Sequence, residues 1–305
     1  MSNRIGIDLG GTKIDAITLS ETGETLFEKR VATPKTYDAV VAAIRDLVLA
    51  AGDGSVGIGS PGSNSRKTNL WRNSNLLFCN GKPFQHDLEA AIGRSVRMEN
   101  DANCFALSEA IDGAGKGYAV VAFFTIGTAL GGGLVVNGKV VVGANSEAGE
   151  FGHTALPWPN ESEWPMLPCF CGKKGCAEQY VSGTGLQRDH LRVTGEDITG
   201  KEIVARARGG DAKAMASLAR LQDRFARVAA NIACVVDPDV FVIGGGLNEL
   251  PELVEQLPPL ISRYSFSGTA EAKVLRAKHG EKSGCEGLRG CGIRPFEARF
   301  AGTSG

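Results

Sequence analysis

The sequence contains one unusual pattern twice, and this repeat limits the folds that the chain can adopt. The segment RIGIDLGGTKIDAITL (4–19) predicts a strand, a glycine turn and a second strand, and ETLFEKRVAT continues as a third strand. About 115 residues later, VVAFFTIGTALGGGLVVNGKVVVG predicts the same order again. Strands mixed with helical segments in this order are typical of α/β proteins. The repeat therefore predicts an α/β protein with two related halves.

The segments between and after the two hairpins predict the remaining elements. Helical spacing of apolar residues predicts helices at 36–52, 83–93, 100–115, 199–209, 211–236 and near 249–264. Short apolar runs predict further strands at 55–62, 95–99, 240–246 and 273–277, and residues 61–83 look like a loop. The boundary between the halves is expected near 113–118. This gives a smaller domain, 1–115 joined by 285–305, and a larger domain, 116–284.

The composition excludes several classes of function. The 305-residue chain has a net charge of −1, so no overall basic field points to nucleic acid or an anionic membrane as a partner. The start, MSNRIGIDLGG, lacks a charged region followed by an apolar one, so no signal peptide is expected and the location is expected to be cytoplasmic. Thiols stay reduced there, so the eight cysteines are not expected to form a disulfide framework.

One uncharged segment, YAVVAFFTIGTALGGGLVV (118–136), nearly reaches the roughly 20 apolar residues that a membrane span needs. Glycines and threonines at its centre favour two short buried strands around a turn instead. We therefore expect a hairpin here and no membrane partner.

Two common nucleotide-binding motifs can be excluded. GIGSPG (57–62) matches G-x-G-x-x-G, but a polar loop follows it where a dinucleotide site needs the N-terminus of a helix. The P-loop pattern G-x-x-x-x-G-K-[ST] does not occur in the chain. A third glycine turn, VIGGGL (242–247), follows a strand and could meet a nucleoside.

The two repeated glycine turns are themselves candidates for phosphate binding. In DLGGTK and TIGTALGGG, glycines let backbone N–H groups approach an anion, and Thr12 and Thr128 can donate hydroxyl hydrogen bonds. Asp8, at the end of a strand, could hold a hydrated Mg²⁺. A plain hairpin turn is the alternative for each motif alone, and two turns in matching places weaken that alternative.

A further candidate is Asp101, which stands in MENDANCFALSEA where a strand ends and a helix starts. The simple interpretation is an N-cap aspartate that satisfies free backbone N–H groups. The functional interpretation is an acceptor for the proton of a substrate hydroxyl. Phosphoryl transfer tolerates a weak base because its transition state is loose and positioning dominates.

These motifs together resemble the ROK sugar kinases over roughly residues 4–284. The resemblance depends on DLGGTK, ENDAN, EFGH (150–153), CFCGKKGCAE and VIGGG. It implies the two-domain actin-like ATPase fold, which is ribonuclease H-like and has a cleft between its domains. It also implies ATP and Mg²⁺ as cofactors, a hexose as substrate, and a homodimer as one option.

Within the family, the segment 60–84 and HTALPWPNE are most similar to bacterial fructokinases, also called mannofructokinases. This similarity implies conversion of fructose to fructose 6-phosphate. NDANCFALSEA is also similar to N-acetylglucosamine kinases, so N-acetylglucosamine, mannose and glucose are alternative substrates. A sugar-responsive ROK regulator is a further alternative, but its N-terminal helix-turn-helix is not expected in a chain whose first strand begins by residue 4.

The cysteine-rich segment PCFCGKKGCAEQY could form a disulfide, hold a metal, attack a substrate or be packed in the core. With His153 it gives the spacing H-x15-C-x-C-x4-C. Three thiolates and one imidazole form a closed tetrahedral Zn²⁺ site, which is typical of a structural ion, and reduced buried thiols are the alternative. The expected ligands are His153, Cys169, Cys171 and Cys176, in a zinc loop at 153–178.

The resemblance also implies which residues bind the substrates. Asp101 is the expected catalytic base, and the residues expected to bind the sugar are Gly62, Asn100, Asp101, Glu150, His153 and Glu178. Those expected to bind ATP and Mg²⁺ are Asp8, Gly10, Gly11, Thr12, Lys13, Gly127, Thr128, Gly131, Gly132, Gly183, Thr184, Gly244, Gly245 and Gly246.

Two segments depart from the family pattern. Ala129 replaces the last glycine of the usual G-T-G turn, so ATP binding is expected to be weaker if this position needs a positive φ. The tail 285–305 has scattered Gly, Arg and Pro in place of a Gly-Ala-rich helix and is expected to be mostly irregular.

Overall fold

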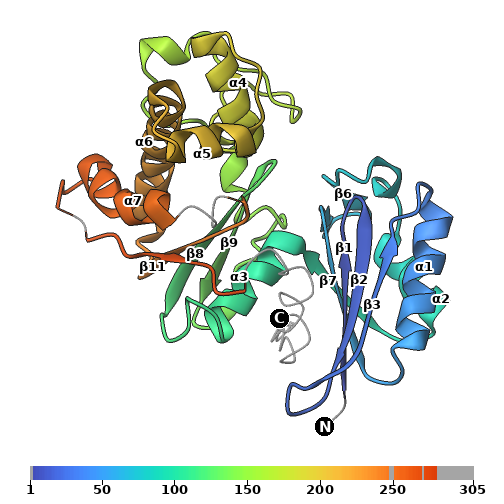
Figure 1. Cartoon of the computed structure of the whole chain (residues 1–305). Helices are drawn as coiled ribbons and strands as arrows, with labels where there is room; N and C mark the ends of the chain where they lie inside the picture. Colours follow the sequence, from blue (N-terminus) through green and yellow to red (C-terminus); the bar gives the residue numbers. More distant parts are fainter. Residues whose placement is uncertain (1–2, 247–250, 270, 280–305) are drawn as a thin grey trace. The chain divides into compact units, whose positions relative to one another are not determined.

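The computed structural model describes residues 3–246, 251–269 and 271–279, and it divides into two compact units on either side of the Cys104–Phe105 bond (Figure 1). The division falls inside helix α3 (Asp101–Ile111), about ten residues before the boundary that the sequence predicts. The expected irregular tail, 285–305, and its assignment to the first domain lie outside the described residues.

The first unit is built on a five-stranded sheet with the order β3-β2-β1-β4-β7. Its strands are β1 (Arg4–Leu9), β2 (Lys13–Leu19), β3 (Thr25–Ala32), β4 (Ser55–Ser60) and β7 (Val96–Asn100). Strands β1, β2 and β3 are antiparallel, while β4 and β7 run parallel to β1. The glycine turn predicted in DLGGTK (8–13) therefore joins β1 to β2.

Two helices pack against this sheet and complete its core (Figure 1). Helix α1 (Tyr37–Ala50) buries the apolar residues Val40, Ile44, Leu47 and Val48, which recur at helical spacing. Helix α2 (Phe84–Ile92) ends at Gly93, whose φ of 77° is the left-handed conformation that glycine adopts easily.

The connection between β4 and α2 was expected as a loop and contains short ordered pieces. It forms a small antiparallel pair, β5 (Ser63–Asn64) with β6 (Trp71–Arg72), and one turn of 3₁₀-helix, η1 (Leu77–Cys79). These pieces are too short to have a hydrophobic period in the sequence.

The second unit repeats the sheet of the first, with the order β10-β9-β8-β11-β12. Its strands are β8 (Val120–Ile126), β9 (Leu130–Val136), β10 (Lys139–Val140), β11 (Val240–Gly244) and β12 (Val274–Arg276). The first three strands are again antiparallel, β11 runs parallel to β8, and β12 runs parallel to β11. The repeat predicted from the two glycine hairpins and the α/β class are both confirmed.

The uncharged segment 118–136 forms the hairpin of β8 and β9, so the hairpin interpretation is confirmed. Among the described residues, no helix combines the length and the apolar character needed to cross a membrane.

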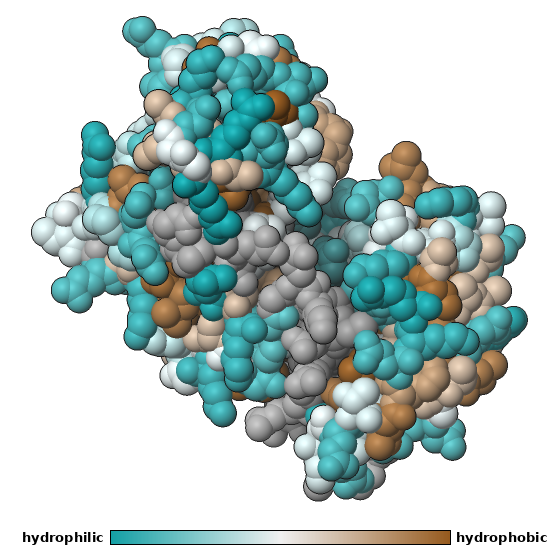
Figure 2. All heavy atoms as spheres, in the orientation of Figure 1, coloured by the Kyte–Doolittle hydropathy of each residue, from teal (hydrophilic) through white to brown (hydrophobic). Residues whose placement is uncertain are grey.

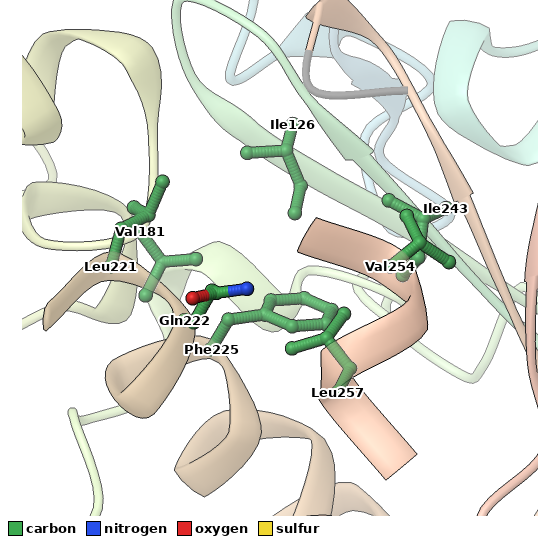
Figure 3. Close-up of a pocket in the computed structure, with 8 residues that line it drawn as sticks. All are labelled: Ile126, Val181, Leu221, Gln222, Phe225, Ile243, Val254 and Leu257. Atoms are coloured by element: carbon green, nitrogen blue, oxygen red, sulfur yellow. The ribbon is translucent and has the colours of Figure 1, made fainter. Parts of the chain in front are cut away.

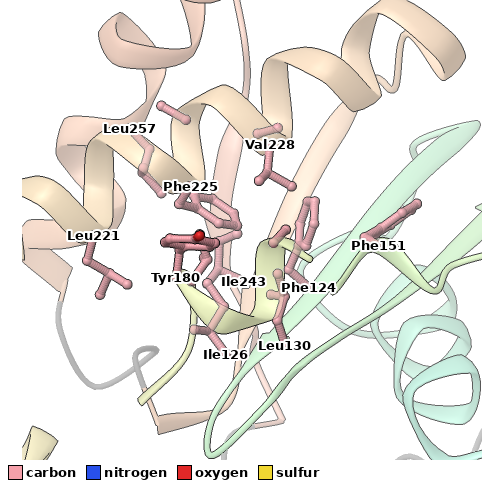
Figure 4. Packing of buried hydrophobic residues seen from close by; sticks show 14 of the residues in the cluster. Phe124, Ile126, Leu130, Phe151, Tyr180, Leu221, Phe225, Val228, Ile243 and Leu257 are labelled. Carbon is pink, nitrogen blue, oxygen red and sulfur yellow. The ribbon is translucent and has the colours of Figure 1, made fainter. Parts of the chain in front are cut away.

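The helices of the second unit are α4 (Gly183–Thr194), α5 (Gly200–Arg208), α6 (Ala212–Val236) and α7 (Pro251–Tyr264). Single 3₁₀ turns lie at η2 (Phe151–His153), η3 (Glu161–Glu163) and η4 (Ala177–Gln179). The core forms between the sheet and α6, where Phe124 contacts Phe151 and Phe225 with ring centroids 5.0 Å apart in each pair (Figure 4).

On the face shown in Figure 2, hydrophilic residues predominate and hydrophobic ones form small separate patches.

Candidate functional site

Asp101 is the first residue of α3, directly after the end of β7. Asn100 caps the helix, because its side-chain oxygen accepts hydrogen bonds from the N–H groups of Ala102 (2.9 Å) and Asn103 (3.3 Å). The simple interpretation of Asp101 as the N-cap is therefore wrong. The Asp101 carboxylate accepts a hydrogen bond from the Ala102 N–H (2.8 Å) and stays exposed to solvent, so a substrate hydroxyl can reach it.

Asp8 and Asp101 lie at the same edge of the first sheet, because β1, β4 and β7 are parallel and end there. Burial, followed by the charges of Asp101 and Asp15, raises the pKa of Asp8 to about 7. Desolvation by the surrounding protein also raises the pKa of Asp101, although hydrogen bonds from backbone N–H groups oppose the shift. A carboxylate with a raised pKa is a stronger base than an ordinary aspartate.

Gly62 and Asn100 are joined by a hydrogen bond from the Asn100 side-chain amide to the Gly62 carbonyl (3.3 Å). Gly62 has a φ of +95°, and a Cβ there would lie 2.6 Å from the Arg72 carbonyl oxygen. Glycine is therefore required at this position by the backbone and by packing. The Asn100 side chain therefore bonds to the Gly62 carbonyl through its NH₂ group and to the Ala102 N–H through its oxygen. These two bonds fix the turn at Gly62 relative to the start of α3.

The first glycine turn joins β1 to β2 and is closed by a hydrogen bond from the Gly10 N–H to the Lys13 carbonyl (2.9 Å). Thr33 Oγ1 also donates to the Gly10 carbonyl (2.8 Å). Gly11 and Thr12 are exposed, and no protein atom lies within 4 Å of a Cβ built on Gly11. Gly11 leaves space beside the backbone that the turn itself does not use, as an approaching anion would need.

Lys13, expected to bind the nucleotide, is half-exposed, and its ammonium lies 3.5 Å from the Asp15 carboxylate. Asp15 is buried and also pairs with Arg30. The Lys13 charge is therefore partly neutralised within the first unit.

The second glycine turn docks on the N-terminus of α4. The Gly183 N–H donates to the Gly127 carbonyl (2.7 Å), and Thr184 Oγ1 donates to the Thr128 carbonyl (2.8 Å). A Cβ on Gly183 would lie 2.9 Å from the Gly127 oxygen, so the contact needs glycine. The structure thus brings together four residues that the sequence predicts for ATP binding. Helix α4 itself was not among the helices that the sequence predicts.

The third glycine turn closes against the end of β8. Gly245 has a φ of +81°, and its Cβ would lie 2.8 Å from the backbone of Ile126. A Cβ on Gly244 would lie 2.9 Å from the Phe105 ring, whereas Gly246 has space around it. The three glycines therefore lie beside the second glycine turn, and two of them are required by packing.

A small apolar cavity of about 20 Å³ lies behind these turns (Figure 3). Ile126 of β8 and Ile243 of β11, which directly precede Gly127 and Gly244, line one side of the cavity. Gln222 provides the polar side chain in the lining. The remaining lining residues are Val181, Leu221, Phe225, Val254 and Leu257.

Three residues near the second turn have other roles or properties than expected. Gly131 and Gly132 lie inside β9, opposite Thr125 and Phe124, and a Cβ on Gly132 would lie 2.5 Å from the Phe151 ring. Packing of β9 on η2 therefore accounts for Gly132. Ala129 does not adopt a positive φ, so alanine causes no backbone strain at this position. Backbone strain therefore gives no reason to expect weaker ATP binding.

The predicted zinc ligands converge in the second unit. One ligand atom from each of His153, Cys169, Cys171 and Cys176 lies within 4.8 Å of all the others. Cys169 Sγ lies 3.6 Å from His153 Nδ1, and Cys171 Sγ lies 3.5 Å from Cys176 Sγ. This set of donors fits a closed tetrahedral zinc site, with His153 Nδ1 facing the metal position.

Short backbone links fold the segment around this cluster. Leu156 and Ala177 donate N–H groups to the Gly175 and Thr154 carbonyls, both at 2.8 Å, and Cys169 donates to Lys173 (2.8 Å). A hydrogen bond from the Lys173 N–H lowers the pKa of Cys171 to about 7, whereas burial raises that of Cys176 to about 12. A metal binds all three as thiolates, so its binding releases protons.

The described cysteines differ in oxidation state. Those of the cluster carry free thiols, as do Cys79 and Cys234. Cys104 is disulfide-bonded, in contrast to the expectation that the thiols are reduced.

Of the three residues predicted to bind sugar in this unit, His153 belongs to the cluster, and Glu150 and Glu178 lie in or beside the turns next to it. Glu150 is exposed and directly precedes η2, which contains His153. Glu178 lies in η4, directly after the last cysteine, is 8% exposed, and its Oε1 lies 3.9 Å from Cys169 Sγ. Turns η2 and η4 contact each other, so the cluster holds the three side chains in one region.

One group that the sequence analysis missed is a buried set of charged residues, Glu163, Arg224 and Arg227. Glu163 accepts hydrogen bonds from both arginines. About 60 residues separate the acid from the bases, so no local pattern could have revealed the contact.

Comparison with known proteins identifies the family. The model of the ROK family matches residues 4–289. The N-acetyl-D-glucosamine kinase of Escherichia coli O9:H4 (strain HS) is 39% identical over 293 residues, which cover 92% of this chain and 96% of that protein. The crystal structure of the ROK hexokinase from Thermus thermophilus has a TM-score of 0.81 and 28% identity, covering 94% of this chain and 96% of that one.

A ROK family glucokinase from Streptomyces griseus, solved in complex with glucose and AMPPNP, has a TM-score of 0.75 and 33% identity. That match covers 94% of this chain and 97% of the glucokinase. The repeated sheets, the glycine turns and the Cys/His cluster are therefore those of a known family: this chain belongs to the ROK family.

Proposed function

We propose that the protein transfers the γ-phosphoryl group of ATP to a hydroxyl of N-acetyl-D-glucosamine. The observation that carries this proposal is the 39% identity, over nearly the whole chain, to an N-acetyl-D-glucosamine kinase. The Asp101 carboxylate, exposed at the N-terminus of α3, supports the chemistry.

In the proposed reaction, Asp101 accepts a hydrogen bond from the acceptor hydroxyl and takes its proton as the bond to phosphorus forms. The transition state of phosphoryl transfer is loose, so orientation of the hydroxyl matters more than the strength of the base. Asn100 and Gly62 contribute by fixing the backbone beside Asp101.

Glu150, His153 and Glu178 are proposed to bind the other hydroxyls of the sugar. Carboxylates that accept hydrogen bonds from hydroxyl groups form strong charge-assisted contacts. With Nδ1 of His153 on the metal side, its Nε2 faces away and can bond to a hydroxyl. His153 and the three cysteines would hold a structural Zn²⁺, which supplies rigidity to this region.

The glycine turns are proposed to bind ATP. Backbone N–H groups around Gly11 and Gly127, with the hydroxyls of Thr12 and Thr128, would contact phosphate oxygens. The third glycine turn, Gly244–Gly246, would contact the nucleoside, because it lies beside the second glycine turn. Asp8 would bind a hydrated Mg²⁺, because its carboxylate lies at the strand edge that also carries Asp101.

Fructose is the second candidate substrate. The segment 60–84 and HTALPWPNE are similar to fructokinases, and residues from 62 onward contact the start of α3 through Asn100. The two candidates differ in the acetamido group, which only N-acetyl-D-glucosamine carries.

A panel of sugars tests the proposal. Purified protein is incubated with ATP, Mg²⁺ and either N-acetyl-D-glucosamine, fructose, mannose or glucose, and release of ADP is measured. We expect the highest kcat/KM with N-acetyl-D-glucosamine. A higher value with fructose would favour the second candidate, and no sugar-dependent ADP with any of the four would reject the kinase proposal.

A further inference from the structure

Glu163 lies in the middle of the zinc loop 153–178, away from the metal ligands. It belongs to η3, and its side chain is only 1% exposed. A capping box fixes the turn locally: the Asn160 side chain accepts from the Ser162 N–H, and Glu163 Oε2 accepts from the Asn160 N–H, both at 3.0 Å. Contacts within the turn itself therefore already orient the Glu163 carboxylate.

Two arginines of α6 bind this carboxylate. Arg224 Nε donates to Glu163 Oε1 at 2.8 Å, and the Arg227 guanidinium donates to both carboxylate oxygens at 2.6 and 3.0 Å. Arg227 also donates to the carbonyls of Pro157 (3.1 Å) and Trp158 (2.8 Å). Both arginines thus hold the zinc loop at Glu163, and Arg227 also holds it at Pro157 and Trp158.

The group buries one carboxyl group between two guanidinium groups. Arg224 and Arg227 are 4% and 3% exposed. Burial opposes ionisation of Glu163, but the hydrogen bonds from Arg227 and Arg224 outweigh it and lower the pKa of the carboxyl. Buried ion pairs often add little net stability compared with apolar residues, so stability alone is a weak explanation for the group.

The contacts continue to the helix that holds the second phosphate turn. Arg224 also donates to Asp189 of α4 at 3.0 Å, and Asp189 accepts from Arg220 at 2.6 Å and from Arg192 at 3.0 Å. The N-terminus of α4 carries Gly183, which binds the Gly127 carbonyl. Helix α6 is therefore linked by ion pairs to both the zinc loop and α4.

We propose that Glu163 is a positioning residue that anchors the zinc loop to α6 independently of the metal and so sets where His153 and Glu178 meet the sugar. This inference rests on the proposed function. The metal would join the two ends of the loop, whereas Glu163 fixes its middle to α6 through Arg224 and Arg227. A loop held only by the metal could pivot about the cluster.

The test compares Glu163→Gln and Glu163→Asp with the matched control Glu161→Gln. Gln keeps the shape but removes the charge, and Asp keeps the charge but is one methylene shorter. Glu161 lies in the same turn and is exposed. For each zinc-loaded protein, we would measure metal content, hydrogen–deuterium exchange of residues 153–178, and kcat and KM for sugar and for ATP.

We expect both Glu163 variants to retain zinc and to exchange faster at 157–167, with KM for the sugar raised about tenfold and kcat changed less. The Glu161→Gln control should match the wild type in every measurement. If Glu163→Gln does not fold, the measurements on Glu163→Asp alone test the proposal.

Unchanged exchange, or an unchanged KM for the sugar, in a folded Glu163 variant would overturn the proposal. Loss of zinc from both variants would overturn the claim that the anchor is independent of the metal. If the wild type phosphorylates none of the sugars, the proposed function fails, and the exchange measurement alone then decides whether Glu163 anchors the loop.

Discussion

At the scale of single residues, the carboxylates at the edge of the first sheet carry the chemistry. Asp101 is exposed at the start of α3, and Asn100 caps the helix, so the Asp101 side chain is available to a substrate. Asp8 lies at the same edge, and its pKa is raised in part by the charge of Asp101.

Asp101→Asn should lower turnover by about 10²–10⁴-fold, because the amide cannot take the proton of the acceptor hydroxyl. Sugar binding, measured by calorimetry, and the unfolding temperature should stay close to those of the wild type. Asp53→Asn is the control, since the Asp53 carboxylate is fully exposed. Near-normal turnover of Asp101→Asn would refute the assignment of the base.

Asp8→Asn should stabilise the metal-free protein increasingly as the pH rises. The pKa of Asp8 is raised from 3.8 to about 7, so between these values the folded state holds a proton that the unfolded chain has released. The contribution of Asp8 to the free energy of unfolding therefore falls across this window, and asparagine removes that loss. Urea unfolding at pH 5 and pH 8 measures the effect. An equal difference between variant and wild type at both pH values would contradict it.

At the scale of elements, glycines with the same appearance in the sequence have different roles. Gly11 lies in an exposed turn with free space beside it, whereas Gly132 lies inside β9 against the Phe151 ring. The sequence predicts that both bind the nucleotide, because a glycine needed for packing cannot be distinguished by its letter from one needed for a ligand.

Gly11→Ala should leave the unfolding free energy nearly unchanged and raise KM for ATP, because the new methyl group would occupy space near the phosphates. Gly132→Ala should lower the unfolding free energy by about 1–3 kcal/mol through overpacking. Chemical unfolding and steady-state kinetics of the two variants check both expectations. Normal ATP binding by Gly11→Ala would argue that this turn is only a hairpin.

The elements that the sequence predicts correctly have a strong period or a clear end. The strands around both glycine turns and helices α1 and α6 are examples. Helix α4 escaped prediction because it begins with the polar, glycine-containing residues GTG, which are typical of a turn. The buried contact between Glu163 and α6 escaped because it joins segments about 60 residues apart.

At the scale of the whole molecule, the repeat found in the sequence corresponds to two sheets of the same topology, each with its own core. Within the described residues, the Cys/His cluster belongs to the second unit alone. The effect of the metal should therefore be confined to one half of the chain.

Removal of the metal by a strong chelator should speed hydrogen exchange in 105–279 and leave the core strands of the first unit nearly unchanged, because the cluster stabilises the loops that cover β9 and α6. Metal analysis before and after treatment gives the occupancy. Cys171→Ser should reproduce the effect, and Cys234→Ser, at an exposed cysteine outside the cluster, should not. Identical exchange with and without chelator would argue against a structural zinc.

The contact between Gly127 and Gly183 limits how this protein can be redesigned. The Gly183 N–H lies 2.7 Å from the Gly127 carbonyl oxygen, and a Cβ at position 183 would lie 2.9 Å from the same atom, so any larger residue would push α4 away from the turn. A library that varies the residues of this turn should therefore keep Gly183 constant.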